Sequence, residues 1–303
     1  MQVTVPKRFS LAIVILHFTT RNLWGQDWSG IIAVRGPLNL TRAIWDRNIT
    51  VVGMYKLIEG FLESLGFPRM TDTFWRSSVL QSPPNKASCH GMAFDMMDPQ
   101  GQDFRIKYCT ERNEEGLRTA VHEMGHIAYF MAYSHQPVLF RRGNVILHEA
   151  IGDSLFLSLK NRGFWGIPSR RSKKEEVEGL GSLLGEALRT LPFLAFSYVV
   201  DEWRWYVSNE ADTNGDEDTL NDDWWQLVRR YQGLSPPEPR RGASHFDPAS
   251  KHHLLLNSPY WPYFLARLLS FQLHEAFCKE KDPSSPLHLC SIYGNKIVGK
   301  KLR

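Results

Sequence analysis

The chain has 303 residues, of which 43% are hydrophobic, 12% aromatic and 22% charged. This composition excludes a disordered, collagen-like or low-complexity protein, and the length allows one large domain or two small ones. The formal net charge is only +4 and is not gathered into a basic stripe, so we expect no nucleic-acid partner.

Residues 1–21 form a separate N-terminal segment in our interpretation. Lys7 and Arg8 precede the apolar run Phe9 to Phe18, which gives the charge and length of the first two regions of a signal peptide. No small-x-small cleavage site follows cleanly, so a truncated or mispredicted start is the alternative. No apolar run reaches the roughly 18 residues of a membrane-spanning helix, and we expect no membrane span in this chain.

Most of the remaining chain is predicted to be helical. Helix-forming composition and an apolar spacing of about 3.6 residues predict helices over 51–65, 114–133, 148–159, 175–191, 224–231 and 263–277. Gly, Pro or Asn residues lie in the breaks between them. The sequence therefore predicts a mainly α fold.

A β-hairpin is predicted in the middle of the first half of the chain. Asp98-Pro99-Gln100-Gly101 is a turn signature whose centre lies midway between Cys89 and Cys109. Four cysteines allow three pairings, but a hairpin folded at this turn brings Cys89 opposite Cys109 at a distance that suits a disulfide. Cys278 and Cys290 remain as the second pair.

Two N-glycosylation sequons point to the same environment as the disulfides. They are Asn39-Leu40-Thr41 and Asn48-Ile49-Thr50, and such triplets also arise by chance. Disulfides and glycans belong to an oxidising, secretory compartment. We therefore expect an extracellular protein, either secreted or tethered to a membrane in a longer product.

The strongest chemical signal is His122-Glu123-Met124-Gly125-His126, inside the helix predicted over 114–133. Two imidazoles four residues apart lie on one helix face, so both can reach a single metal ion. The alternative is a pair of helix histidines that are solvated or act as caps.

The next predicted helix supplies a third ligand. It contains His148-Glu149-Ala150-Ile151-Gly152-Asp153, in which Glu149 can complete the set. Asp153 lies on the same face and can accept a hydrogen bond from a ligand imidazole. Because imidazole and carboxylate donors on helices favour zinc over calcium or magnesium, we predict one zinc ion bound by His122, His126 and Glu149.

A metal ion at this place predicts hydrolytic chemistry. Zinc polarises a carbonyl oxygen and activates water for attack. Glu123 lies next to a ligand without being needed as one, so it is placed to take the proton from water and deliver it to a leaving amine. The predicted reaction is peptide hydrolysis.

These motifs closely resemble the angiotensin-converting enzyme family of zinc peptidyl-dipeptidases. The likeness runs from about Leu23 to Tyr293 and takes in Trp24-Gly25-Gln26-Asp27-Trp28, Asp201-Glu202-Trp203-Arg204-Trp205 and His274-Glu275-Ala276 in the same order. It implies a zincin-type, two-lobed helical fold around a deep cleft, with the hairpin near the active site and a partial peptidase domain over 22–303. It also implies oligopeptide substrates, from whose C-terminus dipeptides are released.

The resemblance assigns further site residues. The implied substrate-binding residues are Gln26, His90, Gly91, Lys251 and Tyr260, and the implied catalytic residues beside Glu123 are His253 and Tyr263. A lysine charge and a tyrosine hydroxyl suit the terminal carboxylate of a peptide, and Tyr263 would stabilise the oxyanion. Without the resemblance, Lys251 and His253 are typical of a solvated loop, and Tyr260 of packing.

The sequence also departs from the family. The spacer between His126 and Glu149 is one residue shorter, so the helix of the third ligand is expected to be displaced or rotated. Val228 and Pro262 stand where chloride-activated members carry arginines, so we expect no chloride dependence of that kind.

The likeness covers only the C-terminal half of the family's catalytic domain. This leaves two alternatives to an active enzyme, namely a non-catalytic peptide- or partner-binding relative and an incomplete fragment of a full-length enzyme. The sequence does not indicate the natural peptide or the oligomeric state.

Overall fold

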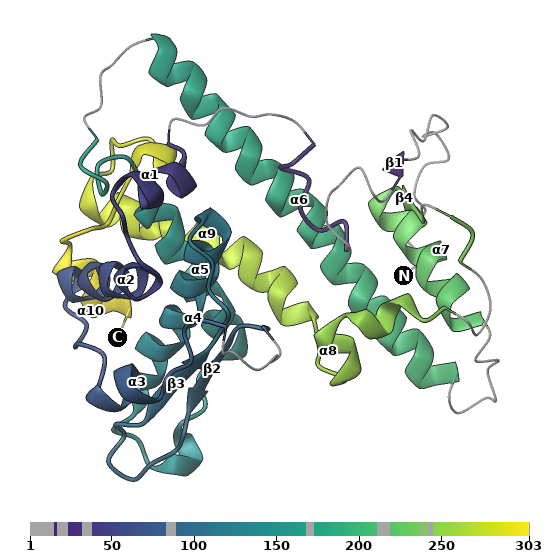
Figure 1. Ribbon diagram of the computed structural model, residues 1–303, viewed down its shortest axis with the longest axis horizontal. Helices are drawn as coiled ribbons and strands as arrows, with labels where there is room; N and C mark the ends of the chain where they lie inside the picture. Colours follow the sequence, from purple (N-terminus) through teal and green to yellow (C-terminus); the bar gives the residue numbers. More distant parts are fainter. Residues whose placement is uncertain are drawn as a thin grey trace. The chain divides into compact units, whose positions relative to one another are not determined.

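The computed structural model describes residues 15–16, 24–31, 38–82, 89–167, 173–210, 219–236, 238–240 and 245–302. The described chain is mainly helical with a small antiparallel pair of strands, which confirms the predicted fold class (Figure 1). Most of the signal-like segment lies outside the described residues, and within it β1 (Ile15–Leu16) pairs in parallel with β4 (Leu234–Ser235).

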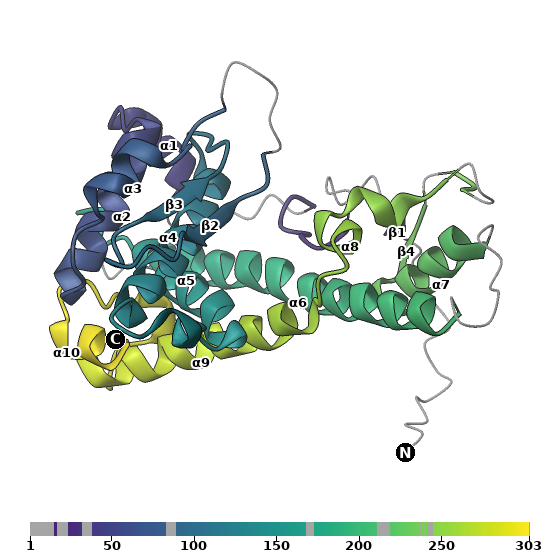
Figure 2. The same ribbon diagram turned by 90° about the horizontal axis from the view of Figure 1, so that it is seen from below.

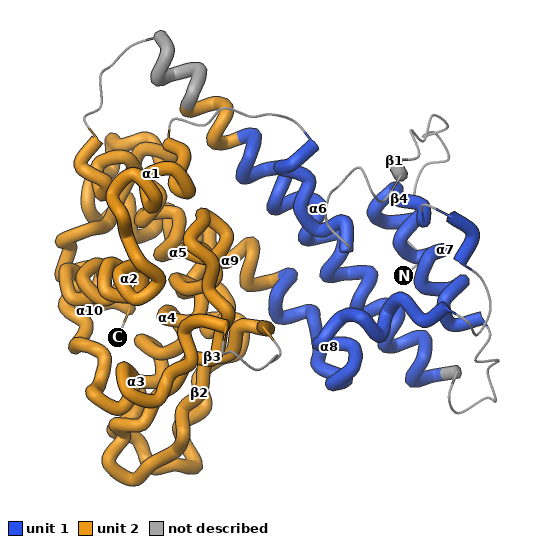
Figure 3. The backbone as a smooth tube through the Cα atoms, viewed as in Figure 1, with its two compact units in different colours: residues 1–34, 184–264 blue, residues 35–183, 265–303 orange. Residues whose placement is uncertain are grey.

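The chain divides into two compact units (Figure 3). Unit 1 consists of Met1–Val34 and Leu184–Phe264, and unit 2 of Arg35–Leu183 and Leu265–Arg303. Two helices contribute residues to both units, α6 (Lys173–Glu210) and α9 (Trp261–Lys281). The other helices of unit 2 are α1 (Leu40–Asp46), α2 (Val51–Leu65), α3 (Asp72–Ser77), α4 (Glu114–Tyr133), α5 (Val145–Leu159) and α10 (Lys296–Leu302), with short 3₁₀ turns at Val138–Phe140 and Leu287–Leu289.

Helices α2 and α4 have the bounds predicted from the sequence. Thr50 caps α2 by accepting a hydrogen bond from Gly53 N–H, and Asn113 caps α4 in the same way from Gly116 N–H. α5 begins three residues before its predicted start at 148, because the side chain of Asn144 accepts hydrogen bonds from the first N–H groups of the helix. The buried faces of these helices form the core of unit 2.

The predicted hairpin and both disulfides are present. β2 (Met92–Asp95) pairs antiparallel with β3 (Phe104–Lys107), and both strands lie beside α4 (Figure 2). Gly101 closes the turn with φ +62° and donates its N–H to Asp98 O at 3.0 Å. The disulfides join Cys89 to Cys109 and Cys278 to Cys290, with Cα–Cα distances of 4.9 and 6.0 Å.

The main correction concerns α6, which was predicted to end at residue 191. It continues through Pro192 to Glu210. Pro192 cannot donate to the carbonyl of Leu188, and that carbonyl instead accepts a hydrogen bond of 2.9 Å from Trp28 N–H. The helix therefore loses one internal bond at the proline without ending there.

Within α6, the stretch Gly179–Asn209 is long and apolar enough to cross a membrane by length and composition alone, which the sequence analysis did not anticipate. Core helices of folded domains meet the same criteria. Its residues Phe196, Val199 and Val200 are fully buried in the core of unit 1. The stretch is therefore weak evidence for a span.

Unit 1 has its own aromatic core around this part of α6. Its other helices are α7 (Leu220–Gln232) and α8 (His252–Leu255), with a 3₁₀ turn at Asp247–Ser250. Trp203 and Trp224 pack edge to face with ring centroids 6.0 Å apart, and Val228 is buried beside them.

Candidate metal centre

Two glycines bring α4 and α5 into backbone contact. A Cβ added at Gly125 would lie 2.6 Å from Gly152 Cα, and one added at Gly152 would lie 2.5 Å from His122 Cα. Only glycine allows this approach. Both glycines lie inside the His122–His126 and His148–Asp153 motifs, but the motifs alone predict no role for them. Their contact places the faces of the two helices that carry the predicted ligands together.

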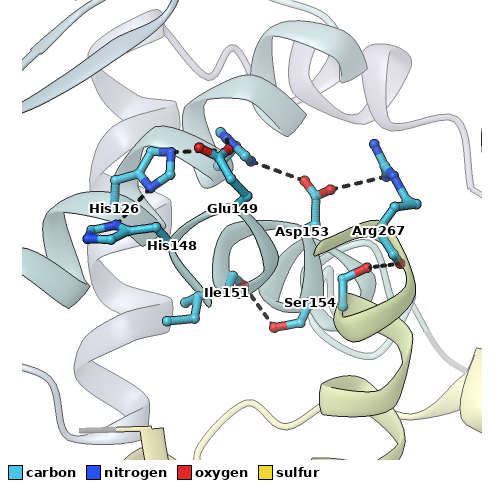
Figure 4. Close-up of polar contacts among 9 residues, drawn as sticks. His126, His148, Glu149, Ile151, Asp153, Ser154 and Arg267 are labelled. Atoms are coloured by element: carbon cyan, nitrogen blue, oxygen red, sulfur yellow. Dashed lines mark hydrogen bonds and ion pairs between the residues drawn. The ribbon is translucent and has the colours of Figure 1, made fainter. Parts of the chain in front are cut away.

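The structure brings the three predicted metal ligands together. His122 Nε2 is 3.1 Å and His126 Nε2 is 3.8 Å from the same oxygen of Glu149. One donor atom from each of the three residues lies within 4.8 Å of the others. The shorter spacer therefore does not displace Glu149 out of reach of the histidines, as Figure 4 shows for His126 and Glu149.

Asp153 holds the far side of His122. Its Oδ1 is 3.2 Å from His122 Nδ1, and its Oδ2 is 3.2 Å from Arg267 Nη1 on α9 (Figure 4). Burial alone would raise the pKa of Asp153, but the charge of Arg267 and the hydrogen bond with His122 hold it well below its usual value. Asp153 thus stays ionised, which fixes the proton of His122 on Nδ1 and turns Nε2 toward Glu149.

Protonation of His122 is favoured in the metal-free chain. Burial would lower the pKa of this imidazole, but its hydrogen bonds to Asp153 and Glu149 outweigh burial and raise the pKa well above 6.5. The same contact with His122 lowers the pKa of Glu149 against the effect of burial. Metal binding at this place must therefore release a proton.

Glu123 is a buried carboxyl group beside these ligands. Glu123 is only 5% exposed. Burial raises its pKa to about 7, while the nearby charge of His122 opposes this rise and that of Glu149 adds to it. The chain at Gly91 passes directly by it, because a Cβ added there would lie 2.7 Å from Glu123 Oε1. A carboxyl group with this pKa can both accept and donate a proton near neutral pH.

His148 precedes Glu149 in the second motif, and no role for it was predicted from the sequence. Its Nδ1 is 3.2 Å from His126 Nδ1, and its Nε2 is 2.9 Å from the Tyr133 hydroxyl. Burial lowers the pKa of His148 to about 4 and that of His126 to about 3, so both are neutral. When His126 presents Nε2 to a metal, its Nδ1–H donates to His148, whose own Nε2–H donates to Tyr133. His148, the residue before Glu149, thus orients His126, the second predicted ligand.

Unit 1 gathers most of the residues assigned to the substrate. Lys251 Nζ lies 5.3 Å from the ring centroid of Tyr260 and 5.7 Å from that of Trp24. His253 Nε2 is 3.0 Å from the Tyr263 hydroxyl, and the rings of Tyr260 and Tyr263 are 4.6 Å apart. Burial lowers the pKa of Lys251 to about 8.

Asp201 positions this aromatic group, a role the sequence analysis did not assign. Its carboxylate accepts the N–H of Tyr260 at 3.0 Å and that of Trp261, where α9 begins. Arg204 Nη1 pairs with the same carboxylate at 2.7 Å. The sequence signal that could have indicated this ion pair is the Asp201-Glu202-Trp203-Arg204 segment, because an aspartate and an arginine three residues apart share a helix face.

A second group of metal-type donors does not fit a metal. His274, Cys278 and Cys290 also have donor atoms within 4.8 Å of one another. The two sulfurs are joined in a disulfide, so neither is the thiolate that binds zinc. In the described part of the chain, the His122, His126 and Glu149 group is the one whose donors fit.

This arrangement is typical of the metallopeptidase class. Such sites combine two imidazoles one turn apart on one helix with a glutamate from an adjacent helix, and here a buried carboxyl group lies beside them. A family model described as angiotensin-converting enzyme, of the peptidase M2 type, matches residues 6–303. The chain belongs to this family.

Named relatives agree with the family assignment. The angiotensin-converting enzyme of Mesocricetus auratus is 40% identical over 293 residues, which cover 93% of this chain and 22% of that protein. The angiotensin-converting enzyme of Theromyzon tessulatum is 35% identical over 311 residues, covering 99% of this chain and 49% of that protein. The angiotensin-converting enzyme-like protein Ace3 of Mus musculus is 34% identical, covering 93% of this chain and 39% of that protein. The chain thus spans between about a fifth and a half of the length of these relatives.

Proposed function

We propose that this chain carries the zinc centre of a peptidyl-dipeptidase, an enzyme that releases dipeptides from the C-terminus of oligopeptides. The observation that carries the proposal is the buried Glu123 carboxyl group, with its pKa of about 7, beside three converging donors. His122, His126 and Glu149 would hold zinc, which supplies polarisation of the scissile carbonyl group and activation of water.

The chain's own residues account for the proton transfers. Glu123 accepts the proton of the attacking water and later gives it to the leaving amine, for which a pKa near the working pH is suited. Asp153 and His148 keep the ligand imidazoles in the required tautomers. The Tyr263 hydroxyl, held by His253 at 3.0 Å, would donate a hydrogen bond to the oxyanion.

Recognition of a free C-terminus is assigned to other residues. Lys251 and the Tyr260 hydroxyl suit the terminal carboxylate, together with Gln26, and the resemblance assigns His90 and His253 to the backbone carbonyl groups of the terminal dipeptide. Binding a carboxylate at a fixed place limits cleavage to a fixed distance from the peptide end. A peptide with an amidated C-terminus should therefore be a poor substrate.

The test compares wild type with Glu123→Gln on an N-terminally blocked tripeptide. We expect wild type to release the C-terminal dipeptide, with cleavage abolished by a chelator, and we expect the variant to lose about 10²- to 10⁴-fold in kcat while still binding zinc. Glu115→Gln, an exposed change on the same helix, is the matched control and should retain activity.

A folded, zinc-loaded wild type that binds the tripeptide without cleaving it would overturn this proposal. That result would favour the non-catalytic, peptide-binding alternative. Cleavage that persists in Glu123→Gln would place the general base elsewhere.

We further propose an extracellular setting, in a secreted protein or one tethered to a membrane as part of a longer product. The two disulfides support it, and both sequon asparagines, Asn39 and Asn48, are exposed. Asn39 caps α1 through Oδ1, which leaves its nitrogen for a glycan. The expectation that activity does not depend on chloride stays a prediction, based on Val228 and Pro262 at the positions where chloride-activated members carry arginines.

A further inference from the structure

Pro192 changes the hydrogen bonding of α6 at one defined place. In an uninterrupted helix, the N–H of residue 192 would donate to the carbonyl of Leu188. Proline has no N–H, and its ring crowds that carbonyl. The carbonyl of Leu188 is therefore available to a donor from outside the helix.

Trp28 provides that donor. Its backbone N–H lies 2.9 Å from Leu188 O, far away in the sequence but within the same unit. The next residue of α6, Arg189, pairs through Nε with the Asp27 carboxylate at 3.4 Å. Segment 24–31 is thus attached to α6 at two consecutive residues, Leu188 and Arg189, in the turn that precedes the proline.

The other face of the segment is held by α7 and the chain that follows it. Gln232 Nε2 donates to the carbonyls of Trp24 at 3.0 Å and Gly25 at 3.3 Å. Gly25 has φ +60°, and a Cβ added there would lie 2.1 Å from Leu234 Cδ1, so the backbone lies directly on Leu234. The Trp28 indole N–H closes the loop on Gly25 O at 2.9 Å.

This docked segment carries Gln26, which the resemblance assigns to substrate binding, and Trp24, which lies beside the assigned Lys251. The Trp24 ring faces Phe196 of α6 at 6.2 Å and lies 5.7 Å from the Lys251 ammonium group. Gln26 stands between the two attachment points, Trp24 and Trp28, and its Oε1 is buried. A shift of the segment would move Gln26 and uncover Lys251 together.

We propose that Pro192 is a positioning residue, which releases the Leu188 carbonyl so that this carbonyl holds segment 24–31 and fixes Gln26 and Trp24 beside Lys251. The part of this inference that concerns peptide binding rests on the proposed function. The docking of the segment does not, because it follows from contacts within unit 1.

Pro192→Ala tests the docking directly. Alanine restores an N–H that competes for Leu188 O and improves helix formation, so we expect the thermal midpoint to stay unchanged or rise. We expect amide exchange in residues 24–31 to accelerate at least about tenfold, since the Trp28 N–H loses its acceptor. If Pro192 had a merely structural role, its replacement would not combine an unchanged or raised thermal midpoint with faster exchange confined to residues 24–31.

The functional readouts separate positioning from catalysis. We expect Pro192→Ala to raise KM for a blocked tripeptide with a free carboxylate about tenfold, with a smaller effect on kcat and an unchanged zinc content. Leu191→Ala, an exposed neighbour on the same helix, is the matched control for both exchange and KM. Asp27→Asn removes the second attachment without altering α6, and it should accelerate exchange in the same segment.

Exchange in 24–31 that is unchanged within twofold in Pro192→Ala would overturn the docking role. Faster exchange with an unchanged KM would overturn the positioning of Gln26 and Trp24. If wild type cleaves no peptide, the proposed function fails, while the exchange measurement still decides whether Pro192 docks the segment.

Discussion

At the scale of single residues, burial is the largest cause of the pKa shifts of two assigned site residues. It raises the pKa of Glu123 to about 7 and lowers that of Lys251 to about 8. Both groups therefore change protonation close to neutral pH. The sequence shows which residues these are, but their pKa values depend on neighbours that only the folded chain supplies.

Lys251 yields a prediction about pH. Its folded pKa of about 8 lies below its ordinary 10.5, so the folded chain loses this proton first as pH rises. Affinity for a peptide carboxylate should fall above pH 8, and KM should approach a tenfold rise for each further pH unit. Because the unfolded chain binds more protons between about 8 and 10.5, the contribution of Lys251 to stability should rise over that same interval.

The measurement is KM against pH from 7 to 9.5, compared with Lys251→Gln. The variant should show a raised KM that no longer depends on pH in this range. A wild-type KM that stays flat to pH 9.5 would show that Lys251 does not bind the carboxylate in its charged form.

The candidate ligand set could be proposed from the sequence, whereas the residues that support it could not. His122 and His126 share a helix face by spacing alone. The contact of His148 with Tyr133 depends on how α5 returns along α4, and a local pattern does not contain that information. Arg267 reaches Asp153 from a helix more than a hundred residues further along the chain.

At the scale of elements, the metal centre depends on the contact between Gly125 and Gly152. Alanine at position 152 would place its Cβ 2.5 Å from a backbone atom of α4, so the helices would have to separate. We expect Gly152→Ala to destabilise the chain by about 1–3 kcal/mol and to weaken zinc binding. Thermal unfolding and a competition assay with a chelator check the two effects.

Gly60→Ala is the matched control for this substitution. Gly60 lies in α2, and a Cβ added there meets nothing within 4 Å. Alanine should stabilise that helix by about 0.5–1 kcal/mol. Equal effects of the two substitutions would contradict the account of close packing.

Helix prediction succeeded where caps and periodicity coincide, as in α2 and α4. It failed at Pro192, because proline usually ends a helix and the donor that replaces its missing N–H, the Trp28 N–H, lies outside α6. It also missed α1 and α3, which have seven and six residues and are too short to show a clear period.

At the scale of the whole molecule, the sequence predicted the protein class and, through the resemblance, a two-lobed helical fold, but not the residues at which the two compact units divide. That division depends on contacts such as Trp28 with Leu188 and Gln232 with Trp24, which join distant parts of the chain. The peptidase domain over 22–303 stays a prediction, and the family match itself spans residues 6–303.

The central claim is that one zinc ion at His122, His126 and Glu149 makes this chain a peptidase. The most direct measurement is a titration of metal-free protein with zinc while dipeptide release from a blocked tripeptide is followed. We predict that the rate rises linearly and breaks at one equivalent of zinc per chain. Folded protein that takes up one equivalent without releasing dipeptide, or that releases dipeptide equally before zinc is added, would contradict the claim.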